Sequence, residues 1–139
     1  MASIHREAVL EVPVAFAWDA LRDVGALHTR LAKGFAVDTR MEEGGAARVV
    51  TFANGVVARE LIIDVDDERR RVAWSAVSER MTHHNASAQL FEVDPRHCRF
   101  VWIADLLPHD VAPMIAQMID AGMAAIRKTL EQSHRERPR

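Results

Sequence analysis

The chain has 139 residues, no tyrosine and only one cysteine, Cys98. Without tyrosine no phenol side chain can act as an acid, base or nucleophile, and a single cysteine excludes a disulfide within the chain. Cys98 comes directly after a turn-like segment, and its neighbour His97 would lie on the opposite face of a strand. We therefore interpret Cys98 as an ordinary buried or edge residue rather than as a nucleophile.

The sequence also lacks an excess of basic charge and any long apolar run. The net charge is -2 and the pI is about 6.4, whereas nucleic-acid binders usually carry a basic patch and a high pI. The basic C-terminal residues are interleaved with Glu131 and Glu136. No segment has the apolar length of a membrane span, and the N-terminal residues lack the apolar core of a signal peptide. We expect a cytoplasmic protein that neither binds nucleic acid nor inserts into a membrane.

Metal and cofactor motifs are missing as well. The seven histidines show no i, i+4 pairing and no cysteine-rich neighbourhood. His83 and His84 are adjacent, so in a strand their side chains point apart. The pair Gly44-Gly45 is typical of a hairpin turn rather than of a phosphate-binding loop. We expect no metal and no cofactor.

The first third of the chain predicts one strand and two short helices. Residues 3–12 alternate weakly, which indicates a strand. Pro13 then opens an apolar stripe at helical spacing that includes Trp18. A second short helix or turn follows over residues 23–32 and ends at Gly34.

From Phe35 onward the apolar period changes to two, which is typical of strands. Asn54-Gly55 is a strong hairpin signal, and the other turns are short, so an antiparallel meander is the natural topology. The predicted strand segments are 35–43, 47–53, 56–65, 72–78, 81–91 and 98–107.

The last element is a long amphipathic helix from about residue 109 to 133. Pro113 is tolerated in its first turn, whereas Gly122 in mid-helix costs about 1 kcal/mol relative to alanine. A close approach by a strand or a ligand would explain this glycine. The fold class is therefore α+β, with the helix across the concave face of a curved antiparallel sheet. Residues 1–133 form one domain, and 134–139 form a polar tail.

This order of elements resembles the START-domain and polyketide cyclase/dehydrase superfamily (SRPBCC), whose members share the helix-grip fold. The motifs that carry the resemblance are "VPVAFAWDALRDV", "RRRVAWSAV", "FVWIADLLP" and the final helix. The stretches "VGALHTRLAKGF" and "VVTFANGVVARELI" resemble an uncharacterised bacterial subgroup. The resemblance implies a cavity between sheet and long helix that takes a hydrophobic small molecule. The superfamily includes cyclases, lipid carriers and co-chaperone domains, so the fold does not decide the activity.

The stretch "MTHHNASAQLF", residues 81–91, supplies the candidate proton-transfer groups. Period two puts His83, Asn85 and Gln89 on one face and His84 with two alanines on the other. Either face gives a cavity wall with one histidine, and the sequence leaves the choice open. Cyclisation or dehydration of a polyketide would use His84 or His83 as acid or base.

Arg59 is the candidate charge-stabilising residue. Val57, Leu61, Ile63 and Val65 share its side of the predicted strand. If that side is internal, the guanidinium would need an anionic or carbonyl partner in the cavity. The alternatives are an ion pair, for instance with Asp105, or a position in water at the open end of the sheet. Glu60 is expected on the exposed side.

Further residues are expected to contact a ligand. Trp74 and Trp102 offer flat aromatic surfaces suited to a planar molecule, although core packing would explain each equally well. The loop around His28 and Lys33 is a candidate lid. The expected ligand-binding residues are Trp74, Asn85, Gln89, Trp102, Asp105, Ile115, Met118, Gly122 and His28.

The leading hypothesis is a protein that binds a polyketide, lipid or aromatic metabolite, with cyclase or dehydratase activity left open. A second hypothesis is a protein-interaction module of the same fold, co-chaperone-like or ribosome-associated, without a small-molecule ligand. A third is a homodimer that packs through the outer face of the sheet or an edge strand.

Overall fold

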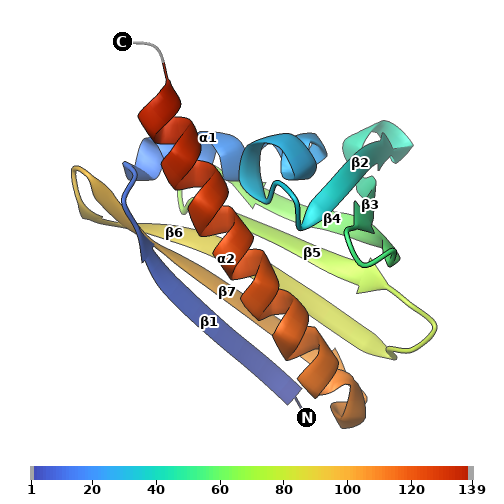
Figure 1. Cartoon of the computed structure of the whole chain (residues 1–139). Coiled ribbons are helices and arrows are strands. Elements are labelled where there is room, and N and C mark those ends of the chain that lie inside the picture. Colours follow the sequence, from blue (N-terminus) through green and yellow to red (C-terminus); the bar gives the residue numbers. More distant parts are fainter. Residues whose placement is uncertain (1, 138–139) are drawn as a thin grey trace.

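The computed structural model describes residues 2–137, and most of them build one antiparallel sheet with a long helix across its concave face (Figure 1). The seven strands lie in the order β1-β7-β6-β5-β4-β3-β2, so consecutive strands from β2 to β7 are neighbours and β7 pairs with β1. The predicted meander and helix-grip architecture are confirmed. The strands are β1 (Ala2–Leu10), β2 (Ala36–Glu42), β3 (Ala47–Phe52), β4 (Val57–Asp66), β5 (Arg71–Val77), β6 (His83–Asp94) and β7 (His97–Leu107).

Two helices complete the fold. The short helix α1 (Val14–Leu21) buries Trp18 at one end of the sheet, with Pro13 as its N-cap. The long helix α2 (Ala112–Glu136) has 25 residues and crosses the concave face alongside β1 (Figure 1). It extends three residues beyond the predicted end at 133, into the segment expected to be a tail. Residues 138 and 139 of that expected tail lie outside the described part of the chain.

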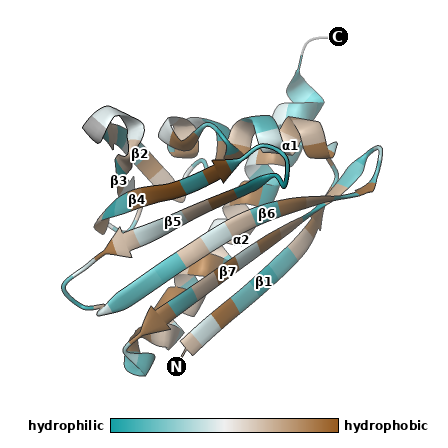
Figure 2. Ribbon diagram, turned by 180° about the vertical axis from the view of Figure 1, so that it is seen from behind, coloured by the Kyte–Doolittle hydropathy of each residue, from teal (hydrophilic) through white to brown (hydrophobic). Residues whose placement is uncertain are grey.

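The register of the sheet decides which side chains meet α2. Ala88 of β6 lies opposite Val72 of β5 and Trp102 of β7, and all three belong to the concave face. Polar residues alternate with them and face outward, which gives the strands their striped hydropathy in Figure 2. The core therefore lies between the concave face and α2.

Hydrogen bonds tie the helix to the rest of the fold, and two of them bear on the site. Arg6 of β1 donates to Asp120 of α2, with Nε and Oδ1 2.7 Å apart. The hydroxyl of Thr129 accepts a hydrogen bond from the backbone N–H of Lys33 at 3.0 Å. The second contact fixes the segment between α1 and β2, where the expected short helix is a 3-10 turn (Val24–Ala26) followed by a π-helical turn (Leu27–Leu31). Within residues 2–137, no helix is long and apolar enough to cross a membrane.

Candidate functional site

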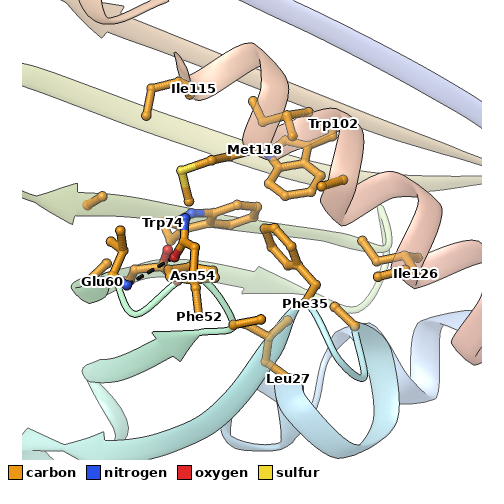
Figure 3. Close-up of a pocket in the computed structure, with 18 of the residues that line it drawn as sticks. Leu27, Phe35, Phe52, Asn54, Glu60, Trp74, Trp102, Ile115, Met118 and Ile126 are labelled. Carbon is orange, nitrogen blue, oxygen red and sulfur yellow. Dashed lines mark hydrogen bonds between the residues drawn. The ribbon is translucent and has the colours of Figure 1, made fainter.

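A cavity of about 1220 Å³ lies between α2 and the concave face of β3–β7 (Figure 3). Its wall is mainly apolar and takes side chains from the sheet, from α2 and from the segment 27–35. Of the expected ligand-binding residues, Trp74, Trp102, Ile115 and Met118 line this cavity. Part of the predicted lid, including Lys33, also belongs to the wall.

The floor of the cavity is aromatic. The indoles of Trp74 and Trp102 meet edge to face, with ring centroids 6.0 Å apart. They come from β5 and β7, and they can meet across the intervening strand β6 because Ala86 and Ala88 present only methyl groups there. Phe35 and Phe52 form a second edge-to-face pair at 5.2 Å. Figure 3 shows Trp74, Trp102 and Phe35 gathered around one space.

A buried ion pair forms the polar part of the wall. Arg48 of β3 and Glu60 of β4 are direct cross-strand partners, and Nε of Arg48 donates to Oε1 of Glu60 at 2.8 Å. Their side chains are only 6% and 10% exposed. The guanidinium also donates to the carbonyl oxygen of Val24 at 3.1 Å and lies 5.6 Å from the ring centroid of Trp74. Arg48 is therefore a buried cation of the cavity wall, and Glu60 balances its charge.

The sequence-based assignment of β4 was inverted. Glu60 lines the cavity, whereas Arg59 lies on the other side of the strand and pairs with Glu42 at 3.2 Å. Val57 and Ile63, expected beside Arg59 on an internal face, are 61% and 54% exposed. A bulge after Ile62 shifts the alternation further along the strand. Arg59 therefore cannot act in the cavity from this position.

His84 is the histidine that faces the cavity, together with Ala88. Its Nδ1 lies 3.2 Å from the backbone nitrogen of Ala76, which is a donor. Nδ1 must therefore keep its lone pair, and the neutral ring carries its proton on Nε2. In this state Nε2 is a hydrogen-bond donor and neither nitrogen is free to accept a proton from a substrate. The geometry disfavours the expected role of His84 as a general base.

The stability of the protein should depend on the protonation of His84. Burial lowers the pKa of this imidazole, and the nearby Glu60 carboxylate opposes that change only in part. In the unfolded chain the ring titrates near about 6.5. Below that pH the ring is protonated in the unfolded chain but stays neutral in the folded protein. The free energy of unfolding should therefore fall as the pH drops from about 7 to 5.5.

Urea unfolding of the wild type and of His84→Asn at several pH values tests this expectation. The asparagine oxygen can still accept from Ala76 N–H, but the side chain does not titrate. Burial also lowers the pKa of His134, which gives the wild type a second contribution of the same sign. The variant should therefore show a reduced pH slope, and an unchanged slope would contradict the assignment to His84.

Four expected site residues lie outside the cavity wall. His83, Asn85 and Gln89 share the outer face of β6, and Gln89 Nε2 donates to the carbonyl oxygen of Arg69 at 3.1 Å. Asp105 is on the outer face of β7, where it accepts a hydrogen bond from Ser3. Because side chains alternate along a strand, all four lie on the other face of the sheet from His84 and Trp102. They cannot reach a ligand held between sheet and helix.

His28 does not line the cavity either. Its Nδ1 lies 3.0 Å from the hydroxyl of Thr39 on β2, which turns the ring away from α2. Leu27 and Leu31, on the same π-helical turn, face the cavity instead. The lid segment thus contributes apolar side chains.

Gly122 is explained by a close approach of the sheet rather than by a ligand. A Cβ added there would lie 2.8 Å from Cζ3 of Trp102 and 3.2 Å from Cε2 of Phe35. Both distances are shorter than ordinary van der Waals contact. The glycine lets α2 pack directly on the indole, which positions Trp102 at the cavity floor.

Gly122→Ala should lower the free energy of unfolding by about 1 kcal/mol. The substitution gains about 1 kcal/mol of helix propensity, but overpacking typically costs about 1–3 kcal/mol. The indole should also move, which tryptophan fluorescence would report. In a Trp102→Leu background the same glycine substitution should cause less destabilisation or become stabilising. Equal effects in both backgrounds would show that Trp102 is not the obstacle.

The single cysteine lies outside the cavity wall. Cys98 is fully buried, and burial raises the pKa of its thiol to about 11, so the thiolate is scarce near neutral pH. Among residues 2–137, no cluster of three or more histidine, cysteine or acidic side chains could hold a metal ion.

Comparison with protein families gives one match over nearly the whole chain. The model described as "Polyketide cyclase / dehydrase and lipid transport" matches residues 1–131. No curated protein matches the sequence.

Solved structures of similar shape are numerous but distant in sequence. An uncharacterised protein from Bacillus thuringiensis superposes with a TM-score of 0.83 at 14% identity, over 93% of this chain and 98% of the other. A norcoclaurine synthase mutant from Thalictrum flavum, in complex with a transition-state analogue, gives 0.75 at 19%, over 97% and 96%. The di-domain ARO/CYC protein BexL of the BE-7585A biosynthetic pathway gives 0.80 at 12%, over 96% of this chain and 48% of that one. At these identities the likeness shows the fold alone.

Proposed function

Because the chain belongs to the polyketide cyclase / dehydrase and lipid transport family, we propose that it binds a hydrophobic small molecule between α2 and the sheet. The observation that carries this proposal is the cavity itself. It measures about 1220 Å³, above the roughly 300–1,000 Å³ that is usual for small-molecule sites. A fold that needed only a packed core would fill this space with side chains.

The lining suits a ligand with a flat ring system. Trp74 and Trp102 present aromatic surfaces from one side, and Met118 and Ile115 lie on the opposite side, on α2 (Figure 3). Aromatic faces bind planar molecules by stacking, while methionine adapts its shape to different partners. We therefore favour a polycyclic or aromatic metabolite over a single acyl chain.

The rim of the cavity supports access for such a ligand. Four apolar residues of the cavity wall are 43–61% exposed: Val56 before β4, Val57 at the start of β4, Val77 at the end of β5 and Met114 on α2. Apolar side chains that are exposed to solvent and also line a cavity indicate where the cavity opens to the surface. A hydrophobic molecule could enter over these apolar side chains.

Binding is favoured over turnover because the two buried titratable groups of the described cavity wall, His84 and Glu60, are both engaged in contacts within the protein. His84 uses Nδ1 as an acceptor for the backbone, and Glu60 is held in an ion pair with Arg48. Cyclisation or dehydration would require a group ready to take a proton and another ready to give one. We propose retention or carriage of the ligand as the activity.

Titration followed by tryptophan fluorescence tests this proposal. Two of the three tryptophans line the cavity, whereas Trp18 lies outside it. Polycyclic aromatic compounds should cause a saturable change in emission at lower concentration than fatty acids of equal carbon number. Absence of saturation with either class, in a folded protein, would contradict the proposed function.

A further inference from the structure

A polar row crosses the apolar wall of the cavity on three neighbouring strands. Glu60 of β4 lies opposite Ala76 of β5 in the strand register. Ala76 in turn lies beside His84 of β6, to which its backbone N–H donates. All three residues line the cavity. The methyl group of Ala76 therefore leaves a gap between a carboxylate and an imidazole.

Of the two polar groups beside this gap, one can only accept hydrogen bonds and the other can only donate them into the cavity. The carboxylate of Glu60 can only accept, and the Arg48 guanidinium bonds to Oε1. The neutral His84 ring can only donate into the cavity, through Nε2, because Nδ1 accepts from Ala76. In the described part of the chain Nε2 of His84 has no hydrogen-bond partner. A ligand group that accepts a hydrogen bond from Nε2 of His84 and donates one to the Glu60 carboxylate would satisfy both side chains.

The charge of the wall restricts that group further. Arg48 and Glu60 cancel each other, and the imidazole is neutral, so this row has no net charge. The remaining charged residues of the cavity wall are solvent-exposed side chains, namely Lys33, Glu79, Arg80 and Lys128. An anionic ligand group placed beside Ala76 would meet the Glu60 carboxylate, and the charge of the nearest buried cation, Arg48, is already balanced by that carboxylate.

We infer that the row of Glu60, Ala76 and His84 recognises a neutral hydroxyl group on the ligand, such as a phenol or an alcohol. The hydroxyl lies over Ala76, donates to Glu60 and accepts from Nε2 of His84. The hydrophobic part of the ligand then extends toward Trp74, whose ring lies next to Arg48. This inference rests on the proposed function, because it assigns the polar contact of a ligand bound in the same cavity.

Three probe compounds separate the hydroxyl contact from hydrophobic binding: naphthalene, 2-naphthol and 2-naphthoate. Their dissociation constants are measured at pH 7.5, where 2-naphthol is neutral. The wild type should bind 2-naphthol more tightly than naphthalene, and 2-naphthoate more weakly than 2-naphthol. A hydrogen bond to a charged group typically changes affinity by about tenfold or more.

His84→Asn is the first variant, because its amide oxygen can still accept from Ala76 N–H while no donor reaches the gap. It should reduce the preference for 2-naphthol over naphthalene by about threefold to tenfold, because the neutral donor is lost while the contact with Glu60 remains. His84→Gln, which can present an N–H near the position of Nε2, is the matched control and should retain more of the preference. Ala76→Leu fills the gap without removing either polar group, and it should also reduce the preference for 2-naphthol. This second variant keeps the test valid if His84→Asn does not fold.

The outcomes distinguish the two proposals. If the wild type binds naphthalene and 2-naphthol equally well, or 2-naphthoate most tightly, the hydroxyl contact is overturned and the hydrophobic site stands. A preference that survives both His84→Asn and Ala76→Leu also overturns it. If neither naphthalene nor 2-naphthol binds to the folded wild type, the proposed function fails and this inference fails with it.

Discussion

Replacing Arg48 by methionine should lower the free energy of unfolding by about 3–5 kcal/mol. The substitution leaves the Glu60 carboxylate in a site where its side chain is only 10% exposed and its charged partner is gone. Breaking a buried ion pair from one side is strongly destabilising for this reason. Urea unfolding monitored by circular dichroism measures the difference.

Two control variants make this result specific. Arg59→Met breaks the neighbouring pair with Glu42, whose side chains are 35% and 36% exposed, and it should cost no more than about 1 kcal/mol. The double variant Arg48→Met with Glu60→Met removes both buried charges and should recover much of the lost stability. A loss below about 1 kcal/mol for Arg48→Met alone, or a double variant less stable than the single one, would contradict a buried pair.

Met118→Trp should weaken the binding of aromatic ligands about 100-fold while leaving the protein folded. Met118 projects from α2 into the cavity opposite Trp74 (Figure 3), and an indole there would occupy the space proposed for the ligand. Because the cavity is larger than the added side chain, the new ring should be accommodated without displacing the core. Isothermal titration with 2-naphthol measures the change.

Gln132→Trp is the matched control for this variant. It adds the same side chain to α2 at an exposed position outside the cavity, so affinity should stay within about twofold of the wild type. Equal affinity in Met118→Trp and the wild type would show that the ligand does not occupy the space beside Met118.

The arrangement of the elements was predictable because apolar periodicity reports it directly. Residues alternate in the strands, and the final helix shows one apolar stripe, so the meander and the covering helix follow from local patterns. Trp74 and Trp102 were also recognisable as inward-facing candidates. Their contact across Ala86 and Ala88 depends on the register of three strands, which no single segment specifies.

The inward face of β4 could not be predicted from its own composition. Phe52 N–H donates to the carbonyl oxygen of Val56, so these two residues pair and a loop of three residues, 53–55, connects them. Gly55 in this loop adopts a positive φ of 88°. A two-residue Asn-Gly turn would shift the pairing by one position and place Leu61 opposite Arg48. That shift exchanges the two faces of β4. The single extra loop residue therefore decides that Glu60 and not Arg59 lies in the cavity.

The polar row was missed because its members are far apart in the sequence. One sign was present: Arg48 alternates with Val50 and Phe52, so a cation shares a face with buried apolar residues. Such a cation requires an acceptor. The acceptor itself could be identified only once the β3–β4 register was known. For His84, the sequence left two faces open, and the donor role of Nε2 depends on the backbone of a different strand.

Native mass spectrometry of the purified wild type and of Met118→Trp tests the central claim most directly. The account predicts that the wild type retains an added aromatic alcohol as a one-to-one complex, and that Met118→Trp does not. A wild type that stays unliganded throughout a panel of polycyclic and acyl compounds would contradict binding in the cavity. Retention of the same compound by both proteins would contradict its location beside Met118 and Trp74.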